Sequence, residues 1–303
     1  MEESNQFLEE NAIIYDTKND NEETAEDIAY VYSGDALDMQ DVFQFSCIED
    51  IEPVIVAGEQ ESGKTTLEVM MYRLFLEGEN ERFKFAGSRT MKGFRTRSEN
   101  LLKKSGSEKP NVPRTLRGEK KFLHLAVCGE DGKRKNLIFA DYAGELFDEP
   151  SCLDELGEFF SDATNVLITL DGKKLCSYND RAKVFSHAKI LLIQMEKSGI
   201  ISKSTHLYIV CTKFDEIKKA EKKEVTMNFL EEKYENLKKT YEMKVKKMEL
   251  ICLCAYGINE EAEKKKMEGL IFEFTRKKEG NCQSLPEKQI VVKRQMDKFR
   301  ARG

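Results

Sequence analysis

The chain has 303 residues, of which 40% are hydrophobic and 34% charged, and its formal net charge is −6. This length and apolar content are enough to build a sizeable core, and we expect one domain with appended segments. Because the chain has no run of eighteen apolar residues, no signal peptide and no Cys-x-x-Cys pair, we expect a soluble, cytoplasmic protein without a membrane span, disulfides or zinc sites.

The charge is unevenly distributed along the chain. Residues 1–50 contain fifteen acidic residues and one lysine, a net charge of −14, so the other 253 residues carry +8. Residues 78–121 concentrate the positive charge, with thirteen Lys and Arg against five Glu. We therefore predict an acidic, disordered N-terminal segment (1–44), a folded domain (45–280) and a basic C-terminal tail (281–303).

The opposite charges of two segments indicate possible binding partners. The acidic segment either folds back on the basic stretch at 78–121 or binds a different partner. Nucleic acid is a weakly supported partner, because no nucleic-acid-binding module accompanies the basic stretch.

The first apolar strand, residues 53–57, leads into a loop that matches G-x-x-x-x-G-K-[ST] at 58–65, and a helical pattern follows to residue 76. This strand–loop–helix context disfavours a chance match. The two glycines allow backbone N–H groups to surround a polyphosphate at the positive end of the following helix. The lysine supplies charge for the β- and γ-phosphates, and the first threonine is placed to coordinate Mg²⁺. The predicted nucleotide-binding residues of this loop are Gly58, Gln60, Glu61, Ser62, Gly63, Lys64, Thr65 and Thr66.

A basic insertion follows at 78–117. It contains several glycines and prolines and is too long for an ordinary connection, which is typical of a functional loop. An antiparallel hairpin is expected next, with strands at 121–128 and 136–140, and it leads directly into Asp141. Asp141 can hold a Mg²⁺-bound water, and the Gly144 N–H can reach a γ-phosphate. The alternative interpretation is a plain turn after a strand.

The rest of the chain alternates strands and helices. Expected strands lie at 165–170, 206–211 and 248–255, and expected helices at 146–162, 181–197, 221–243 and 260–277. Such alternation predicts an α/β fold with a mostly parallel six-stranded sheet, one antiparallel edge strand and helices on both faces. In this architecture ligands bind at the carboxyl ends of the strands, where the phosphate loop lies.

Two loops at strand ends indicate which base is bound. Thr212-Lys213-Phe214-Asp215 follows a strand, and the Asp215 carboxylate can accept hydrogen bonds from guanine N1–H and the exocyclic amine. Adenine has no donor at these two positions, so the residue favours GTP over ATP. The Lys213 stem can lie along the base plane. At the last strand, Cys254, Ala255 and Tyr256 form a weaker signal, in which the Ala255 N–H contacts the guanine oxygen.

Together, these residues resemble the G1, G3, G4 and G5 elements of TRAFAC-class small GTPases, in the same order across residues 52–278. Within that class, the chain is similar to the bacterial double-GTPase family of predicted conflict or defence gene clusters. The stretches that carry this second resemblance are Ala86-Gly87-Ser88-Arg89-Thr90, Gly93-Phe94, Pro113-Arg114-Thr115 and Asp141-Tyr142-Ala143-Gly144-Glu145. The resemblance implies a Ras-like P-loop G domain with a Mg²⁺-dependent GTP/GDP cycle. It also implies effector proteins that bind the nucleotide-sensitive segments and the basic insertion.

The resemblance further assigns roles to single residues. Thr115 is the best candidate for the G2 threonine, ahead of Thr90 and Thr96, and would bind Mg²⁺ with Thr65 and Asp141. The expected catalytic residues are Lys64, Glu145, Thr115 and Arg114. Arg114 stabilises charge in this view, although a surface or tail-pairing arginine is the competing interpretation.

Two positions depart from the family pattern. Glu145 replaces the usual water-orienting Gln, so it either acts as a base or leaves the site slow. Thr212 replaces the usual Asn, which is expected to loosen the base loop.

The leading function that the sequence predicts is a GTP-hydrolysing switch. The alternatives are a GTP-binding scaffold with little turnover and an ATP-using phosphotransferase, which Asp215 disfavours.

Overall fold

The structure of the 303-residue chain is a computed structural model that describes residues 33–76, 82–102, 120–142, 150–161, 163–255 and 261–276. Several predicted features lie outside these residues. They are most of the acidic N-terminal segment, the C-terminal tail, and the positions Arg114, Thr115, Gly144, Glu145 and Tyr256.

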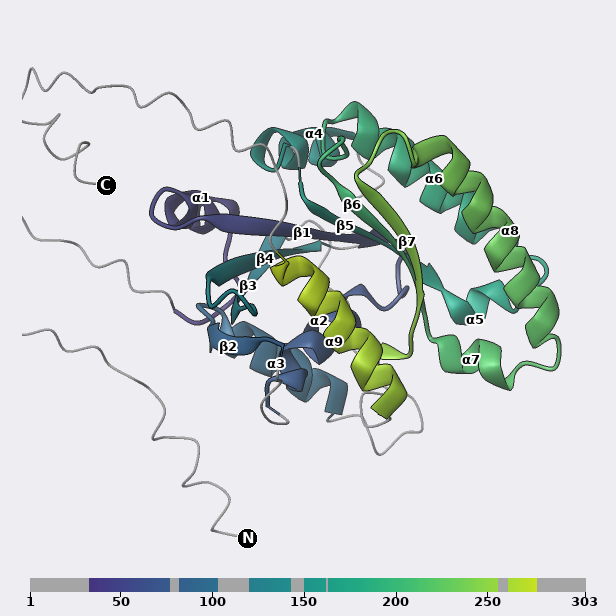
Figure 1. The fold of residues 1–303 in the computed structure, drawn as a ribbon, viewed down its shortest axis with the longest axis horizontal. Helices are drawn as coiled ribbons and strands as arrows, with labels where there is room; N and C mark the ends of the chain where they lie inside the picture. The colour runs from purple at the N-terminus through teal and green to yellow at the C-terminus, as the bar shows by residue number, and fades with distance from the viewer. Residues whose placement is uncertain are drawn as a thin grey trace, which may run out of the picture. The chain divides into compact units, whose positions relative to one another are not determined.

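The described elements alternate between helices and strands, as the sequence predicts (Figure 1). The strands are β1 (Ile51–Gly58), β2 (Lys84–Gly87), β3 (Lys120–Cys128), β4 (Arg134–Tyr142), β5 (Asn165–Asp171), β6 (His206–Thr212) and β7 (Lys247–Cys252). The helices are α1 (Met39–Ser46), α2 (Lys64–Leu74), α3 (Met91–Leu102), α4 (Pro150–Phe159), α5 (Gly172–Leu175), α6 (Arg181–Lys197), α7 (Phe214–Lys219), α8 (Lys223–Tyr241) and α9 (Glu261–Thr275).

These strands form one seven-stranded sheet in the order β2-β3-β4-β1-β5-β6-β7. From β4 to β7 all neighbours are parallel, and β3 runs antiparallel to both β2 and β4. Every residue of β5 and β6 is buried, which is why the sequences of these strands are mostly apolar. The predicted fold class is confirmed.

The strand count corrects one detail of the prediction, since the sheet has seven strands rather than six. The additional strand, β2, comes from the basic insertion and displaces β3 from the edge. Its four residues include the exposed Lys84 and Phe85, so it carries no apolar run that would reveal it. It forms because β3 offers a free edge for pairing.

Successive strand residues point to opposite faces, which creates two apolar cores. In β1, Ile55 and Ala57 join the core under α1, α4, α6 and α8, whereas Val54 and Val56 join the core under α2, α3 and α9. Figure 1 shows the two groups of helices on opposite sides of the sheet. This two-sided covering leaves the carboxyl ends of the central strands to the connecting loops.

Helix α1 lies within and just after the segment expected to be disordered. Asp38 caps the helix in a capping box with Asp41, and Val42 and Phe45 are buried in the core. Leu37 also pairs with Phe122 of β3 through two backbone hydrogen bonds. The expected boundary at residue 44 therefore falls inside α1. The sequence did not indicate this helix, because its two turns are too short to show a sustained hydrophobic periodicity.

None of the helices in the described ranges is both long enough and apolar enough to cross a membrane.

Candidate nucleotide-binding site

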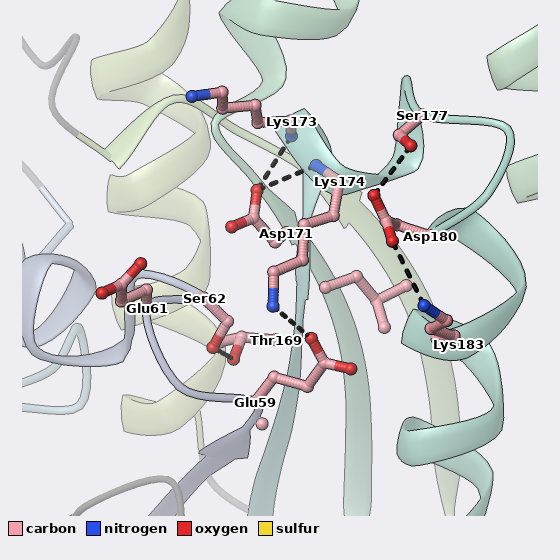
Figure 2. Close-up of polar contacts among 12 residues, drawn as sticks. Glu59, Glu61, Ser62, Thr169, Asp171, Lys173, Lys174, Ser177, Asp180 and Lys183 are labelled. Carbon is pink, nitrogen blue, oxygen red and sulfur yellow. Dashed lines mark hydrogen bonds and ion pairs between the residues drawn. The ribbon is translucent and has the colours of Figure 1, made fainter.

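The phosphate loop connects β1 to α2, and its backbone requires its glycines. Gly58 and Gly63 both have positive φ angles, of +151° and +90°. A Cβ on Gly58 would collide with the hydroxyl and carbonyl oxygens of Thr169. The Thr169 hydroxyl also hydrogen-bonds that of Ser62 at 2.6 Å, as Figure 2 shows. The loop therefore packs directly against Thr169, near the carboxyl end of β5.

Lys64 begins α2 and folds back over the loop. Its ammonium donates to the carbonyl oxygens of Gly58 (3.0 Å) and Glu59 (2.9 Å), and its side chain is buried. Gly63, at the N-cap of α2, has no side chain to cap the first-turn N–H groups. The positive end of the helix and the ammonium thus lie at the same loop, which suits a phosphate group. Gln60 and Thr66, the other predicted loop contacts, are partly exposed.

The structure brings together two of the three predicted metal ligands. The Thr65 hydroxyl donates to Asp141 Oδ1 at 3.2 Å, and the Asp141 carboxylate is buried at the end of β4. Hydroxyl and carboxylate oxygens are ligands that Mg²⁺ prefers, so these residues fit the ion. Within the described ranges no group of three or more His, Cys, Asp and Glu could hold a metal. Mg²⁺ would therefore take its remaining ligands from phosphate, water or the third predicted residue.

Glu68 lies one helical turn after Thr65 and is only 1% exposed. Burial raises the pKa of its carboxyl well above the usual range, and the neighbouring charge of Asp141 raises it further. The charges of Arg97 and Lys64 oppose this shift but do not cancel it. Burial and the Asp141 charge therefore favour the protonated, neutral form of the Glu68 carboxyl. Sequence reasoning missed it, although its spacing of three from Thr65 places both on one helix face.

The predicted base loop is tied to the phosphate loop. The Thr212 hydroxyl lies within hydrogen-bonding distance of the Ser62 and Leu170 carbonyl oxygens, at 2.6 and 3.1 Å. Lys213 has a left-handed backbone, and its ammonium donates to the Glu61 carbonyl oxygen at 2.7 Å. Thr212, at the position where Asn is usual, therefore makes a hydrogen bond between the two loops, and the expected loosening of the base loop stays a prediction.

Asp215 lies at the start of α7 beside the last strand. Burial alone would raise the pKa of its carboxyl, but hydrogen bonds from the Cys254 thiol and from Lys219 outweigh this effect and lower it. The side chain is 35% exposed. The carboxylate is therefore ionised and partly accessible to water, as the predicted contact with guanine requires.

Glu263 of α9 holds the loop after β7 and was not predicted. Its side chain is 1% exposed and accepts a hydrogen bond from the Cys254 backbone N–H at 2.8 Å. Lys218 and Lys266 also pair with it, at 2.9 and 3.1 Å. The buried Ala255, whose N–H is the expected base contact, follows this anchored residue.

Three further contacts around the site were not predicted. Asp171, at the end of β5, accepts from the Lys173 N–H at 2.9 Å and pairs with the Lys213 ammonium at 2.6 Å. Lys174 pairs with Glu59 at 2.7 Å (Figure 2). The position of Asp171 at a strand end was a usable signal, as for Asp141. The Lys174–Glu59 pair joins residues 115 positions apart and had no local signal.

Thr90, a weaker candidate for the G2 threonine, has a structural role. It is fully buried, and its hydroxyl accepts from the His124 backbone N–H at 2.8 Å. This contact fixes the connection between β2 and α3 to β3. Thr96 lies within α3.

Comparisons with known proteins add family information. The sequence matches the family model described as Double-GTPase 2 over residues 52–264. No curated protein matches the chain. Among solved structures, the chain resembles the Roco2 RocCORdC protein of Methanosarcina barkeri bound to GDP, with 16% sequence identity and a TM-score of 0.37. The match covers 75% of this chain but only 49%, about half, of the Roco2 chain. It also resembles the signal recognition particle receptor SRb-GTP/SRX complex from Chaetomium thermophilum, with 16% identity and a TM-score of 0.45 over 74% of this chain and 99% of that chain.

The family model matches more than half of the chain, and the matched range contains the phosphate loop, Asp141 and the loop from Thr212 to Asp215. The double-GTPase resemblance expected from the sequence is confirmed. The chain belongs to the Double-GTPase 2 family.

Proposed function

We propose that this chain binds GTP and GDP with Mg²⁺, hydrolyses GTP and acts as a molecular switch. Membership of the Double-GTPase 2 family supports guanine-nucleotide binding and GTP hydrolysis in general. The observation that carries the proposal is the position of Asp215. Its ionised carboxylate is part of a loop that Thr212 and Lys213 join to the phosphate loop.

The phosphates would lie over the loop between β1 and α2. N–H groups of the loop and of the first turn of α2 donate to phosphate oxygens, and Lys64 exchanges its two carbonyl acceptors for the β- and γ-phosphates. Thr65 and Asp141 hold Mg²⁺, with Thr115 as the proposed third ligand. When bound, Mg²⁺ neutralises charge that develops on the phosphate oxygens.

Hydrolysis would depend on residues outside the described ranges. Gly144 and Thr115 bind the γ-phosphate, and loss of that phosphate releases their segments for a partner to detect. Glu145 orients the attacking water or acts as its base. Turnover is slow in this proposal, because a carboxylate beside an anionic phosphate is repelled. Arg114 stabilises the charge that develops during the reaction.

Two other functions make different predictions for the same assays. A GTP-binding scaffold would bind GTP tightly and release almost no phosphate, an outcome that Glu145 favours. An ATP-using phosphotransferase would bind ATP at least as well as GTP. That preference would leave Asp215 without donors from the base.

Isothermal titration of the full chain with GTP, GDP and ATP, with and without Mg²⁺, tests the proposal. We expect GTP and GDP to bind at least about a hundredfold more tightly than ATP, and Mg²⁺ to strengthen GTP binding. Multiple-turnover phosphate release then separates a GTPase from a scaffold. A preference for ATP, or no binding of either nucleotide, would overturn the proposal.

The family resemblance also suggests a setting for the switch. We propose a cytoplasmic role in a bacterial defence or conflict system, with an effector protein that binds the GTP form through the basic insertion. Nucleic acid is the weaker candidate partner. Affinity capture with the chain loaded with a non-hydrolysable GTP analogue or with GDP would identify an effector, which should be retained only by the GTP-like form.

A further inference from the structure

Arg97 of α3 is bonded to the carboxylate that the proposed function assigns to Mg²⁺. Its Nε and one terminal nitrogen both lie 2.7 Å from Asp141 Oδ2. The side chains of Asp141 and Arg97 are 1% and 20% exposed, so water screens this pair only weakly. A buried carboxylate is costly unless it is paired, and the guanidinium supplies that partner.

Both oxygens of Asp141 are therefore engaged. Oδ1 accepts from the Thr65 hydroxyl at 3.2 Å, and Oδ2 accepts from Arg97. A Mg²⁺ ion held by Thr65 and Asp141 would lie near the guanidinium, which is also positively charged. Like charges a few ångströms apart repel strongly in a site that excludes water. The Arg97 guanidinium and the Mg²⁺ ion would thus both bind the Asp141 carboxylate.

We propose that Arg97 and Mg²⁺ compete for Asp141. Arg97 is a positioning residue: its guanidinium pairs with Asp141 when Mg²⁺ is not bound, and Mg²⁺ displaces it from that carboxylate on entering with the nucleotide. This inference rests on the proposed function and adds a regulatory role for the basic insertion, to which α3 belongs.

Two sets of contacts hold different parts of α3. Its first half is fixed by Phe94, which is fully buried and stacks on Tyr72 of α2 with ring centroids 4.7 Å apart. Arg97 lies further along the helix and also donates to the Gly93 carbonyl oxygen at 3.2 Å, which orients its guanidinium. Release of Asp141 would therefore loosen the second half of α3. Residues 103–119, which include Thr115, follow directly in the sequence.

The test measures the Mg²⁺ dependence of GDP binding by the full chain. Calorimetric titration of Mg²⁺ into the GDP complex should give an affinity about tenfold or more higher for Arg97→Ala than for the wild type. Arg97→Lys keeps the charge and should restore much of the competition. Arg95→Ala is the matched control, because Arg95 lies on the same helix but is 72% exposed and pairs with Glu99. It should leave the Mg²⁺ affinity unchanged.

Hydrogen exchange of the wild-type chain gives a second readout that needs no variant. Adding Mg²⁺ to the GDP complex should speed amide exchange toward the C-terminal end of α3. Unchanged or slower exchange there, or an Arg97→Ala affinity for Mg²⁺ no higher than that of the wild type, would overturn this inference. Failure of the wild type to bind GDP would instead overturn the proposed function.

Discussion

The Thr212 hydroxyl lies 2.6 Å from the Ser62 carbonyl oxygen, although the two residues are 150 positions apart in the chain. This contact joins the end of β6 to the phosphate loop. The two loops are close here, because a Cβ added to Gly63 would lie 3.5 Å from the Cβ of Thr212. The predicted base loop and the phosphate loop are thus joined, which would fix the distance between them before a nucleotide binds.

Thr212→Val should test this unit, because valine keeps the shape of threonine but lacks the hydroxyl. The Ser62 carbonyl oxygen, the nearer of the two acceptors, loses its hydroxyl donor, so we expect the free energy of unfolding to fall by about 1–3 kcal/mol. GTP affinity should fall as well. Denaturant unfolding and nucleotide titration measure the two effects, and Thr212→Ser, which retains the hydroxyl, should lose much less of both. Equal behaviour of the two variants would show that the hydroxyl is unimportant.

Asp215→Asn should change the base preference. An amide can donate where the carboxylate only accepts, so it suits xanthine, which has a carbonyl oxygen in place of the guanine amine. We expect GTP affinity to fall by at least about a hundredfold and XTP to become the better ligand. The neighbouring, exposed Glu216 provides a control in Glu216→Gln. Retention of GTP preference by Asp215→Asn would place the base elsewhere.

The parts of the structure that could be predicted are those that a short stretch of sequence determines by itself. An apolar run that leads into the phosphate-loop pattern predicted the place of β1 and α2, and acidic residues at or shortly after the ends of apolar runs indicated Asp141 and Asp215. Tertiary contacts were not predictable in this way. β2 forms only because β3 offers it an edge. Arg97 and Lys174 read as ordinary surface cations, since nothing near them in the sequence indicates which carboxylate they reach.

His124 should make stability depend on pH. Burial lowers the pKa of its ring to about 4, and the charges of Arg89 and Arg134 add to this, while Asn136 and Glu49 oppose it. The Arg89 backbone N–H donates to Nδ1 at 2.9 Å, so the neutral ring carries its proton on Nε2, facing Asn136. Protonation would break the Arg89 contact and bury a charge.

The sign follows from linkage. In the unfolded chain the ring titrates near pH 6.5, so the unfolded state binds more protons between pH 6.5 and about 4. Stability is complete above pH 6.5 and is lost as the pH falls towards 4, by about 3 kcal/mol. His124→Gln cannot titrate and should remove this difference. Denaturant unfolding of both proteins across this range measures it, and parallel curves would contradict the assignment to His124.

Glu263 should be needed for guanine binding although it does not touch the base in our proposal. Its buried carboxylate accepts from the Cys254 N–H and pairs with Lys218 and Lys266. Glu263→Gln can still accept from Cys254 but loses both ion pairs, whereas Glu263→Ala loses all three contacts. We expect the alanine variant to lose about 1–3 kcal/mol of stability, with a smaller loss for glutamine.

The effect on binding separates a local anchor from a general stabiliser. If Glu263 fixes the loop that carries Ala255, Glu263→Ala should weaken GTP binding about tenfold or more. Inorganic triphosphate, which has no base, should bind with unchanged affinity, because the phosphate loop lies on other strands. Glu261→Gln, at an exposed position on the same helix, should change neither. Equal loss of GTP and triphosphate binding would mean that Glu263 stabilises the whole domain rather than the base loop.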